Sequence, residues 1–248
     1  MLGELSVIGI GPGDPELLTL KALRIIKESP VLCVPKGREE GSSLALSIVE
    51  KAVDIYGKEI MEAHFPMKKT RQCGSEEQKA FGRTPDHGLD RKWNETVDAI
   101  LGKLRTGTNV AFLTLGDPTV YSTFFYVYDK LLEMQPGLHI EIIPGVSSIN
   151  ASAARANISL GLGNDKIAVL PANYLDNLRI TLETFDTVVL MKVNKVFNEI
   201  VRLLSEMNMS QKAVCISRAG MEDEMIFDNI LEIKQEELNY FSMIIVRK

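Results

Sequence analysis

Three short turns that contain glycine carry residues able to grip a ligand through the backbone. Residues 9–14 read GIGPGD, residues 115–118 read LGDP and residues 144–148 read PGVSS. Each turn follows an apolar run that predicts a β-strand. In an open α/β sheet, ligands bind outside the carboxyl ends of the strands, and glycine lets a ligand approach N–H and C=O groups closely. One such turn can be an ordinary strand-to-helix connection, but three at one sheet edge predict a binding site.

The first turn does not match the common nucleotide-binding motifs. A dinucleotide fingerprint, G-x-G-x-x-G, would need glycine or alanine where Asp14 stands, and a carboxylate after the second strand. That strand instead ends Val34-Pro35-Lys36. No lysine follows the glycines at the spacing of a P-loop. The turn therefore disfavours ATP and NAD as ligands. Without an NAD site, an NAD-dependent dehydrogenase is disfavoured too.

The elements that must position these turns alternate between strand and helix in the first half of the chain. Apolar periodicity predicts helices over 17–28 and 93–104, and one after Ser42 or Ser43, either of which can act as its N-cap. The predicted strands are 4–10, 31–34 (ended by Pro35), 59–64 and 109–115. This alternation predicts βαβ units in a parallel sheet that is covered on both faces. The polar stretch 68–91 is predicted to be a long loop or lid.

The second half is less regular and predicts a mixed sheet. Helices are expected at 121–134, 147–156, 176–183 and 196–206, and strands at 139–143, 167–170, 187–191, 213–217 and 243–246. The segment 224–226 and the last strand suggest antiparallel hairpins. A boundary near residues 118–121 would give two α/β domains, 1–118 and 119–248, with an active-site cleft between them.

Composition and charge restrict the class of protein. The chain has 248 residues, of which 45% are apolar and 25% charged, as in ordinary globular proteins. The net charge of −5 argues mildly against general nucleic-acid binding. The chain starts without a basic, signal-like segment and has no apolar run of about 20 residues, so we expect a cytoplasmic protein that does not bind membranes.

The cysteines and histidines do not predict a metal site or a disulfide framework. Cys33, Cys73 and Cys215 form no CxxC pair, and the three histidines are scattered. Cys33 and Cys215 lie in apolar runs, which predicts buried structural thiols. We therefore expect no protein-bound metal.

Taken together and in order, the three turns resemble the signatures of the tetrapyrrole methylases. The matching stretches are GIGPGDPELLTLKA at 9–22, LTLGDPTVY at 113–121 and PGVSS at 144–148. The resemblance covers essentially the whole chain. It implies the two-domain α/β fold of that family and S-adenosylmethionine as methyl donor, with S-adenosylhomocysteine as product.

Further stretches look like the precorrin-2 or cobalt-factor II C20-methyltransferases of cobalamin biosynthesis. They are VPKGREEGSS at 34–43, HFPM at 64–67, FLTLGDPTVYSTF at 112–124 and NDKIAVLPAN at 164–173. Uroporphyrinogen methyltransferases carry an acidic general-base motif after the second strand, where this chain has Pro35-Lys36-Gly37. The resemblance implies methylation of C20 on a small-molecule tetrapyrrole by a homodimer. The loop 71–90 is longer than the subgroup pattern.

By resemblance, one set of residues would contact the cofactor and another the substrate. The cofactor set is Pro12, Leu115, Gly116, Asp117, Val120, Ser147, Ser148, Met191 and Ala219. The substrate set is Gly11, Gly13, Asp14, Lys36 and Arg38, and further cations that could bind the substrate carboxylates are Lys68, Lys69, Arg71 and Arg218. No catalytic residue is assigned, because transfer from a sulfonium chiefly needs alignment.

Alternatives remain at the level of residues and of function. Asp117 could stabilise its own turn through an Asx hydrogen bond, and Met191 could be a core residue at the end of a strand. The chain could also be a methylase of the same fold that acts on diphthamide or ribosomal RNA, or a non-catalytic tetrapyrrole-binding module.

Overall fold

The computed structural model describes residues 1–36, 43–64, 87–172 and 177–248. Two compact units divide these residues: unit 1 comprises Met1–Gly11 and Pro15–Val146, and unit 2 comprises Pro12–Asp14 and Ser147–Lys248. Both units are α/β, as predicted. The division falls later than the predicted boundary near residues 118–121. The helix and strand that follow position 121 complete the sheet of unit 1.

Unit 1 is built on the predicted parallel sheet. Its strands are β1 (Leu5–Gly9), β2 (Val31–Lys36), β3 (Glu59–His64), β4 (Val110–Thr114) and β5 (Ile140–Ile143). They lie in the order β3-β2-β4-β1-β5, and every neighbouring pair is parallel. Its helices are α1 (Leu20–Glu28), α2 (Leu44–Glu50), α3 (His87–Arg105) and α4 (Phe125–Met134).

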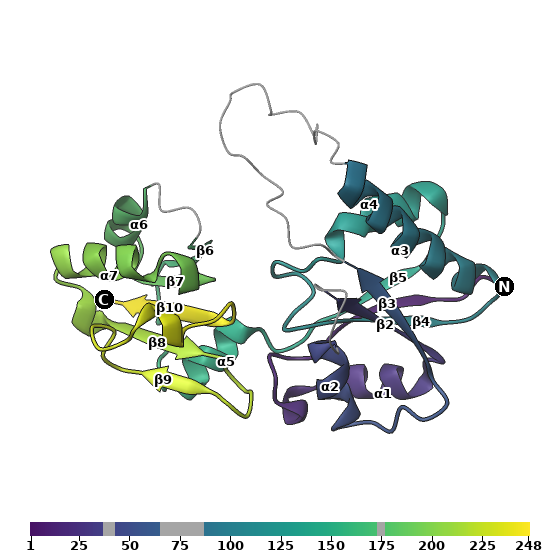
Figure 1. The fold of residues 1–248 in the computed structure, drawn as a ribbon, viewed down its shortest axis with the longest axis horizontal. Helices are drawn as coiled ribbons and strands as arrows, with labels where there is room; N and C mark the ends of the chain where they lie inside the picture. Colours follow the sequence, from purple (N-terminus) through teal and green to yellow (C-terminus); the bar gives the residue numbers. More distant parts are fainter. Residues whose placement is uncertain (37–42, 65–86, 173–176) are drawn as a thin grey trace. The chain divides into compact units, whose positions relative to one another are not determined.

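Alternate side chains of the central strands enter two separate cores. Val7 and Phe112 pack with α3 and α4, whereas Ile8 and Leu113 pack with α1 and α2. The period of two follows from strand geometry, in which successive side chains point to opposite faces. Figure 1 shows α3 and α4 on one face of this sheet and α1 and α2 on the other. The sheet is thus covered on both faces, as predicted.

The ends of several elements differ from the prediction. Strand β2 runs through Pro35 to Lys36 instead of ending at the proline, because its pairing with β4 ends at Cys33 and only the β3 side remains paired. Helix α3 begins at His87, inside the stretch predicted as a loop, and the rest of that loop lies outside the described residues. Helix α4 begins at Phe125, later than predicted, because Tyr121 adopts a left-handed φ of 54°.

Unit 2 carries the predicted mixed sheet. Its strands are β6 (Ile167–Pro171), β7 (Thr187–Met191), β8 (Ala213–Ser217), β9 (Met225–Phe227) and β10 (Ser242–Arg247), in the order β6-β7-β10-β8-β9. Only β6 and β7 pair in parallel; the other neighbours are antiparallel, including the predicted hairpin of β9 on β8. The helices are α5 (Ser148–Arg155), α6 (Leu178–Thr184) and α7 (Phe197–Glu206).

One core of unit 2 lies between its sheet and helices α6 and α7. Leu182, Phe197 and Ile244 are among its buried members. The predicted burial of two thiols is confirmed: Cys33 and Cys215 are fully buried, in unit 1 and unit 2 respectively. Burial raises the pKa of both thiols, that of Cys215 to about 12. Among the described residues, no helix is long and apolar enough to cross a bilayer.

Candidate functional site

The sheet order of unit 1 brings the three glycine turns to one edge. Strands β4, β1 and β5 are consecutive neighbours and run parallel, so their carboxyl ends lie side by side (Figure 1). The turns that begin at Gly9, Leu115 and Pro144 follow directly from these three ends. The prediction that the turns share a sheet edge is therefore confirmed.

The first and second turns are joined by two reciprocal backbone hydrogen bonds. The N–H of Gly116 donates to the carbonyl of Gly11 at 2.8 Å, and the N–H of Gly11 donates to the carbonyl of Gly116 at 3.3 Å. Both glycines have a positive φ, 67° at Gly116 and 79° at Gly11. A residue with a Cβ would be strained in that conformation, so glycine is required for this bridge.

The first and third turns approach each other too closely for side chains. A Cβ on Gly145 would lie 2.4 Å from the carbonyl oxygen of Gly116 and 2.7 Å from the backbone of Gly9. A Cβ on Gly9 would lie 2.6 Å from the amide nitrogen of Gly145. The three turns thus form one packed backbone cluster, which we call the glycine cluster: Gly9, Gly11, Gly116 and Gly145.

Asp117 ties the second turn to the third. Its Oδ2 accepts from the N–H of Gly145 at 3.0 Å, and its Oδ1 accepts from the N–H of Thr119 at 2.8 Å and from the Thr119 hydroxyl. Burial acts to raise the pKa of the Asp117 carboxyl, but the hydrogen bonds from Thr119 and Gly145 outweigh it and hold the pKa below its ordinary value. The proposed Asx turn is present, and the carboxylate also braces the neighbouring turn.

In unit 2, the segment Pro12–Asp14 packs on the turn that follows β8. A Cβ on Gly13 would lie 2.5 Å from Met221 Cγ and 3.0 Å from the backbone of Gly220. Gly220 has a φ of 75°. A Cβ on Gly220 would lie 3.3 Å from the amide nitrogen of Asp14 and 3.4 Å from Cγ of Pro12. This turn carries Ala219, which is buried. Two predicted residues of the first turn, Pro12 and Gly13, are therefore brought together with Ala219, which lies far away in the sequence.

Ser147, Ser148 and Met191 lie at element ends in unit 2. Ser147 is the N-cap of α5, and its hydroxyl accepts from the N–H of Ile149 at 3.1 Å. Ser148 is the first residue of that helix. Met191 ends β7 and is half-buried, while its carbonyl accepts from the N–H of Ala172 at 2.7 Å. Its partial exposure leaves room for the binding role as well as the core role.

The predicted cations have protein partners where the structure describes them. The Lys36 ammonium lies 2.9 and 3.0 Å from the two carboxylate oxygens of Glu62 on the neighbouring strand β3. Arg218, with a left-handed φ of 57°, pairs with Asp223. The other predicted cations, Arg38, Lys68, Lys69 and Arg71, lie outside the described residues.

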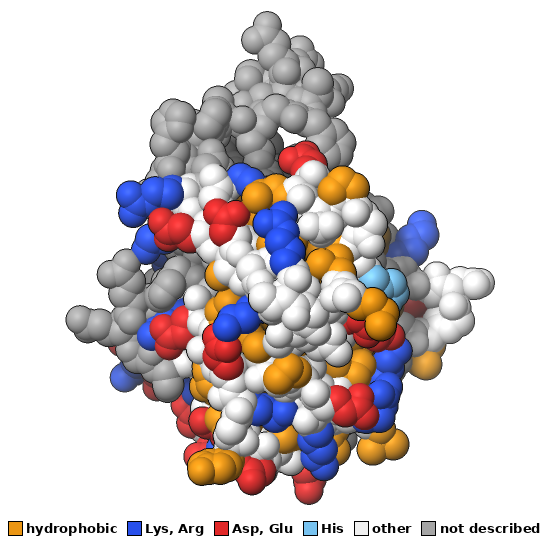
Figure 2. All heavy atoms as spheres, turned by 90° about the vertical axis from the view of Figure 1, so that its right-hand side faces the viewer, with side chains coloured by type: hydrophobic (Ala, Val, Ile, Leu, Met, Phe, Trp, Pro, Cys, Tyr) orange, Lys and Arg blue, Asp and Glu red, His pale blue; other side chains and the backbone are white. Residues whose placement is uncertain are grey.

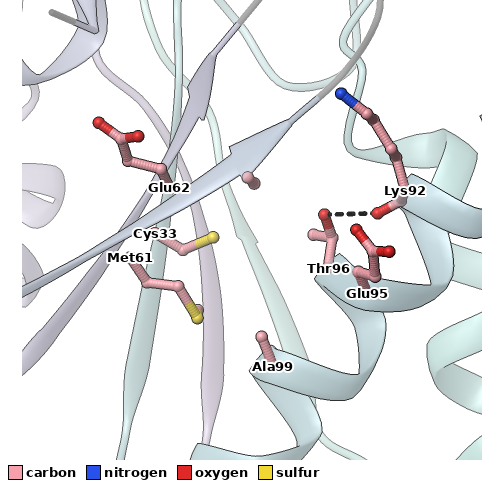
Figure 3. Close-up of a pocket in the computed structure, with 8 residues that line it drawn as sticks. Cys33, Met61, Glu62, Lys92, Glu95, Thr96 and Ala99 are labelled. Carbon is pink, nitrogen blue, oxygen red and sulfur yellow. Dashed lines mark hydrogen bonds between the residues drawn. The ribbon is translucent and has the colours of Figure 1, made fainter. Parts of the chain in front are cut away.

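A pocket of about 200 Å³ opens in unit 1 between strands β2 and β3 and the start of α3. Its lining combines apolar side chains, such as Cys33 and Met61, with the charged side chains of Glu62, Lys92 and Glu95. Figure 3 shows the Cys33 sulfur directed toward α3, and the Thr96 hydroxyl donating to the carbonyl of Lys92. The pocket was not predicted, because its walls come from three segments that lie about 30 residues apart in the sequence.

Sequence reasoning also missed three polar partners of the predicted residues. Thr119 donates to Asp117, Glu62 binds Lys36, and Glu224 accepts from the N–H of Gly220 at 2.6 Å. Thr119 could have been found from the spacing of an Asx turn. Glu62 carries no local signal, because strand register sets its partner; Glu224 follows its partner Gly220 by four residues, but no known motif marks that turn.

The described residues hold no cluster of three or more His, Cys, Asp or Glu side chains suited to a metal ion. On the face drawn in Figure 2, acidic, basic and apolar side chains are interspersed among the described residues. The described residues on that face form no continuous basic stripe of the kind that binds a nucleic-acid backbone.

The chain matches a family model and full-length relatives. Residues 4–233 match the model "Tetrapyrrole (Corrin/Porphyrin) Methylases". The chain is 35% identical to the "Probable cobalt-precorrin-2 C(20)-methyltransferase" of Methanocaldococcus jannaschii, over 97% of this chain and 94% of that protein. It is 33% identical to the "Cobalt-precorrin-2 C(20)-methyltransferase" of Salmonella typhimurium, over 100% of this chain and 98% of that protein.

A solved structure shares the fold at lower identity. The uroporphyrin-III C-methyltransferase of Thermus thermophilus, complexed with S-adenosylhomocysteine, superimposes with a TM-score of 0.64 and 20% identity. The match covers 99% of this chain and 98% of that one. This likeness supports the two-unit α/β architecture over the whole length.

Proposed function

The chain belongs to the tetrapyrrole methylase family, and from this premise we propose that it transfers a methyl group from S-adenosylmethionine to C20 of a precorrin-2-type tetrapyrrole in cobalamin biosynthesis. The observation that carries the proposal is identity of 33–35%, over essentially the whole length, to two proteins named as cobalt-precorrin-2 C(20)-methyltransferases. Both names specify cobalt-precorrin-2, so we propose a cobalt-bound substrate, cobalt-factor II or its reduced form cobalt-precorrin-2, rather than metal-free precorrin-2.

The residues predicted to hold the cofactor have chemistry that fits it. The lowered pKa keeps Asp117 ionised at neutral pH, so it can accept from an ammonium or a hydroxyl group. Leu115, Val120 and Met191 are half-buried apolar residues that can contact an adenine ring. Ser147 and Ser148 begin helix α5, and exposed amides at a helix start favour a carboxylate. We propose these residues, with Pro12, Gly116 and Ala219, as the cofactor contacts.

The protein's part in the reaction is alignment. S-adenosylmethionine supplies a methyl group already activated on a sulfonium, and the accepting bridge carbon is electron-rich. The chain's own residues need to hold the two reactants in line and exclude water. The lowered pKa makes Asp117 a poor proton acceptor, which suits binding rather than base catalysis. The proposal therefore assigns no general base.

Lys36 is proposed to bind a carboxylate of the tetrapyrrole, with Arg38 as a second cation. Lys36 lies at the carboxyl end of β2, next to β4 in the sheet and so at the same edge as the glycine cluster. Its side chain is 12% exposed and already paired with Glu62. A substrate carboxylate would share or replace that partner. Gly11, Gly13 and Asp14 complete the proposed substrate set.

A homodimer is also part of the proposal, on the family resemblance alone. Light scattering on the purified protein would test it, since the monomer has a mass of 27.6 kDa. A particle of that mass at working concentration would contradict the dimer without bearing on the activity.

Incubation with S-adenosylmethionine and each substrate separately, followed by mass spectrometry of the product, tests the function. We expect the cobalt-bound substrate to gain one methyl group, and isotope labelling with NMR to place that methyl group at C20. A gain on precorrin-2 alone would correct the metal assignment. Methylation of ribosomal RNA or of the diphthamide precursor, with no methylated tetrapyrrole, would overturn the proposal. Tetrapyrrole binding without turnover would favour the non-catalytic module.

A further inference from the structure

Glu224 is a half-buried residue with a largely buried side chain, and it belongs to none of the predicted site motifs. Its side chain is 9% exposed, and both of its oxygens have partners in unit 2. Oε2 accepts from the N–H of Gly220 at 2.6 Å, and Oε1 accepts from Nε of Arg155 at 2.6 Å. Withdrawing a carboxylate from water without such partners is unfavourable, so the contacts explain why this one is tolerated.

The first partner lies in the turn that carries Ala219. This turn contains two left-handed residues, Arg218 and Gly220, with φ of 57° and 75°. A non-glycine residue in that conformation is held there by its surroundings. Within the turn, the N–H of Met221 donates to the carbonyl of Arg218. The N–H of the preceding residue, Gly220, donates to the carboxylate of Glu224. Glu224 thereby fixes the turn on which Gly13 rests.

The second partner ends the helix that begins at the serine motif. Arg155 is the last residue of α5, and Ser148 is the first. A residue with positive charge at the end of a helix is favoured by the helix dipole. The ion pair with Glu224 therefore connects the turn that carries Ala219 to helix α5.

We propose that Glu224 is a positioning residue for S-adenosylmethionine, because it holds the Ala219 turn and helix α5 in a fixed relation. The inference rests on the proposed function, in which Ala219, Ser147 and Ser148 contact the cofactor. It assigns Glu224 no contact with either reactant. Its loss should therefore affect the cofactor and spare the tetrapyrrole.

Calorimetric titration of S-adenosylhomocysteine into the unaltered protein and its variants tests the proposal. We expect Glu224→Ala to weaken binding about tenfold, and Glu224→Gln to weaken it less, because its amide oxygen can still accept from Gly220. The matched control is Glu206→Ala, which removes a carboxylate paired with an arginine, Arg179, on helices α6 and α7. The control should bind like the unaltered protein.

Steady-state kinetics separate positioning from general damage. We expect the KM for S-adenosylmethionine to rise about tenfold in Glu224→Ala, while the KM for the tetrapyrrole stays within about twofold. If that variant does not fold, Glu224→Gln and Arg155→Met carry the same test with smaller expected rises. Equal cofactor affinity in folded variants, or equal rises in both KM values, would overturn the inference. Absence of S-adenosylhomocysteine binding by the unaltered protein would instead overturn the proposed function, and the inference with it.

Discussion

Replacement of Asp117 is the sharpest test of how the glycine cluster is held. In Asp117→Ala the N–H of Gly145 loses its acceptor at 3.0 Å, and Thr119 loses two local hydrogen bonds. Thr119 is exposed, so water can replace its lost partner. The amide of Gly145 is half-buried and packed against Gly9 and Gly116, so it is harder to resolvate.

The magnitude follows from the hydrogen bond that spans two turns. A hydrogen bond to a charged group contributes about 1.5–3 kcal/mol, and we assign little to the exposed Thr119 bonds. The free energy of unfolding should therefore fall by about 2 kcal/mol in Asp117→Ala. Asp117→Asn retains one acceptor oxygen and can satisfy Gly145 or Thr119 but not both, so it should lose about 1 kcal/mol.

The pH dependence gives a second readout with a defined sign. The pKa of the Asp117 carboxyl is lower in the folded state than its ordinary value. Its contribution to the free energy of unfolding is therefore fully present above its pKa in the unfolded chain, about 4. That contribution is lost as the pH falls through its pKa in the folded protein. The stability difference between the unaltered protein and Asp117→Asn should narrow as the pH is lowered from about 6 to about 3.

Urea unfolding followed by circular dichroism measures both effects, with calorimetry for S-adenosylhomocysteine binding. Asp54→Ala is the matched control, because the bond that Asp54 accepts among the described residues is local: it comes from the N–H of Tyr56 at 2.9 Å, in an exposed turn. An Asp117→Ala variant as stable as this control would refute the bracing role of the carboxylate. We expect Asp117→Ala to weaken cofactor binding by about 1–3 kcal/mol. Unchanged cofactor affinity in a folded variant would show that Asp117 serves only the structure of its turn.

Other replacements probe packing, substrate binding and the buried thiols. Gly145→Ala should destabilise the fold by about 2–3 kcal/mol in the same urea experiment, since its Cβ would lie 2.4 Å from a backbone oxygen. Gly102→Ala in helix α3 should instead stabilise the fold by about 0.5–1 kcal/mol, because the new Cβ would meet no atom within 4 Å. Lys36→Met should raise the KM for the tetrapyrrole about tenfold and leave calorimetric S-adenosylhomocysteine affinity unchanged; an unchanged KM would remove Lys36 from the substrate site. Cys33 and Cys215 should react with a thiol reagent only after unfolding, because burial raises the pKa of both thiols. A chromogenic thiol reagent, followed by absorbance in a variant whose third cysteine is replaced by alanine, checks this prediction. Rapid reaction of the folded protein would contradict it.

Much of the fold could be predicted because local patterns of apolar residues identify its strands and helices. Runs such as Val110–Thr114 are buried at every position, and a strand buried on both faces needs that composition. The unit boundary could not be predicted in this way. The strand Ile140–Ile143 belongs to unit 1 because it pairs with Leu5–Gly9, and such pairing across some 135 residues leaves no local pattern. The turn near Pro118 interrupts the pattern without ending the unit.

The candidate site divides in the same way. Gly11, Gly116 and Gly145 could be identified because glycine in a strand-end turn is a local signal, and their mutual contacts explain the requirement. Glu62 and Glu224 could not, since one depends on which strand lies beside Val31–Lys36 and the other on a turn that folds back on its own sequence. The partner of Glu62 is set by tertiary structure, whereas the partner of Glu224 is set by the conformation of a local turn.

The placement of Pro12–Asp14 in unit 2 makes the protein poorly suited to dissection into separately expressed halves. The chain leaves unit 1 after Gly11, returns at Pro15 and leaves again after Val146, so it crosses between the units three times. A fragment that ends at Val146 would carry Gly13 without the turn at Gly220 and Met221 on which it packs. A fragment that begins at Ser147 would expose that turn. For gene fusion or domain exchange, a cut between Val146 and Ser147 would therefore separate Pro12–Asp14 from the rest of unit 2.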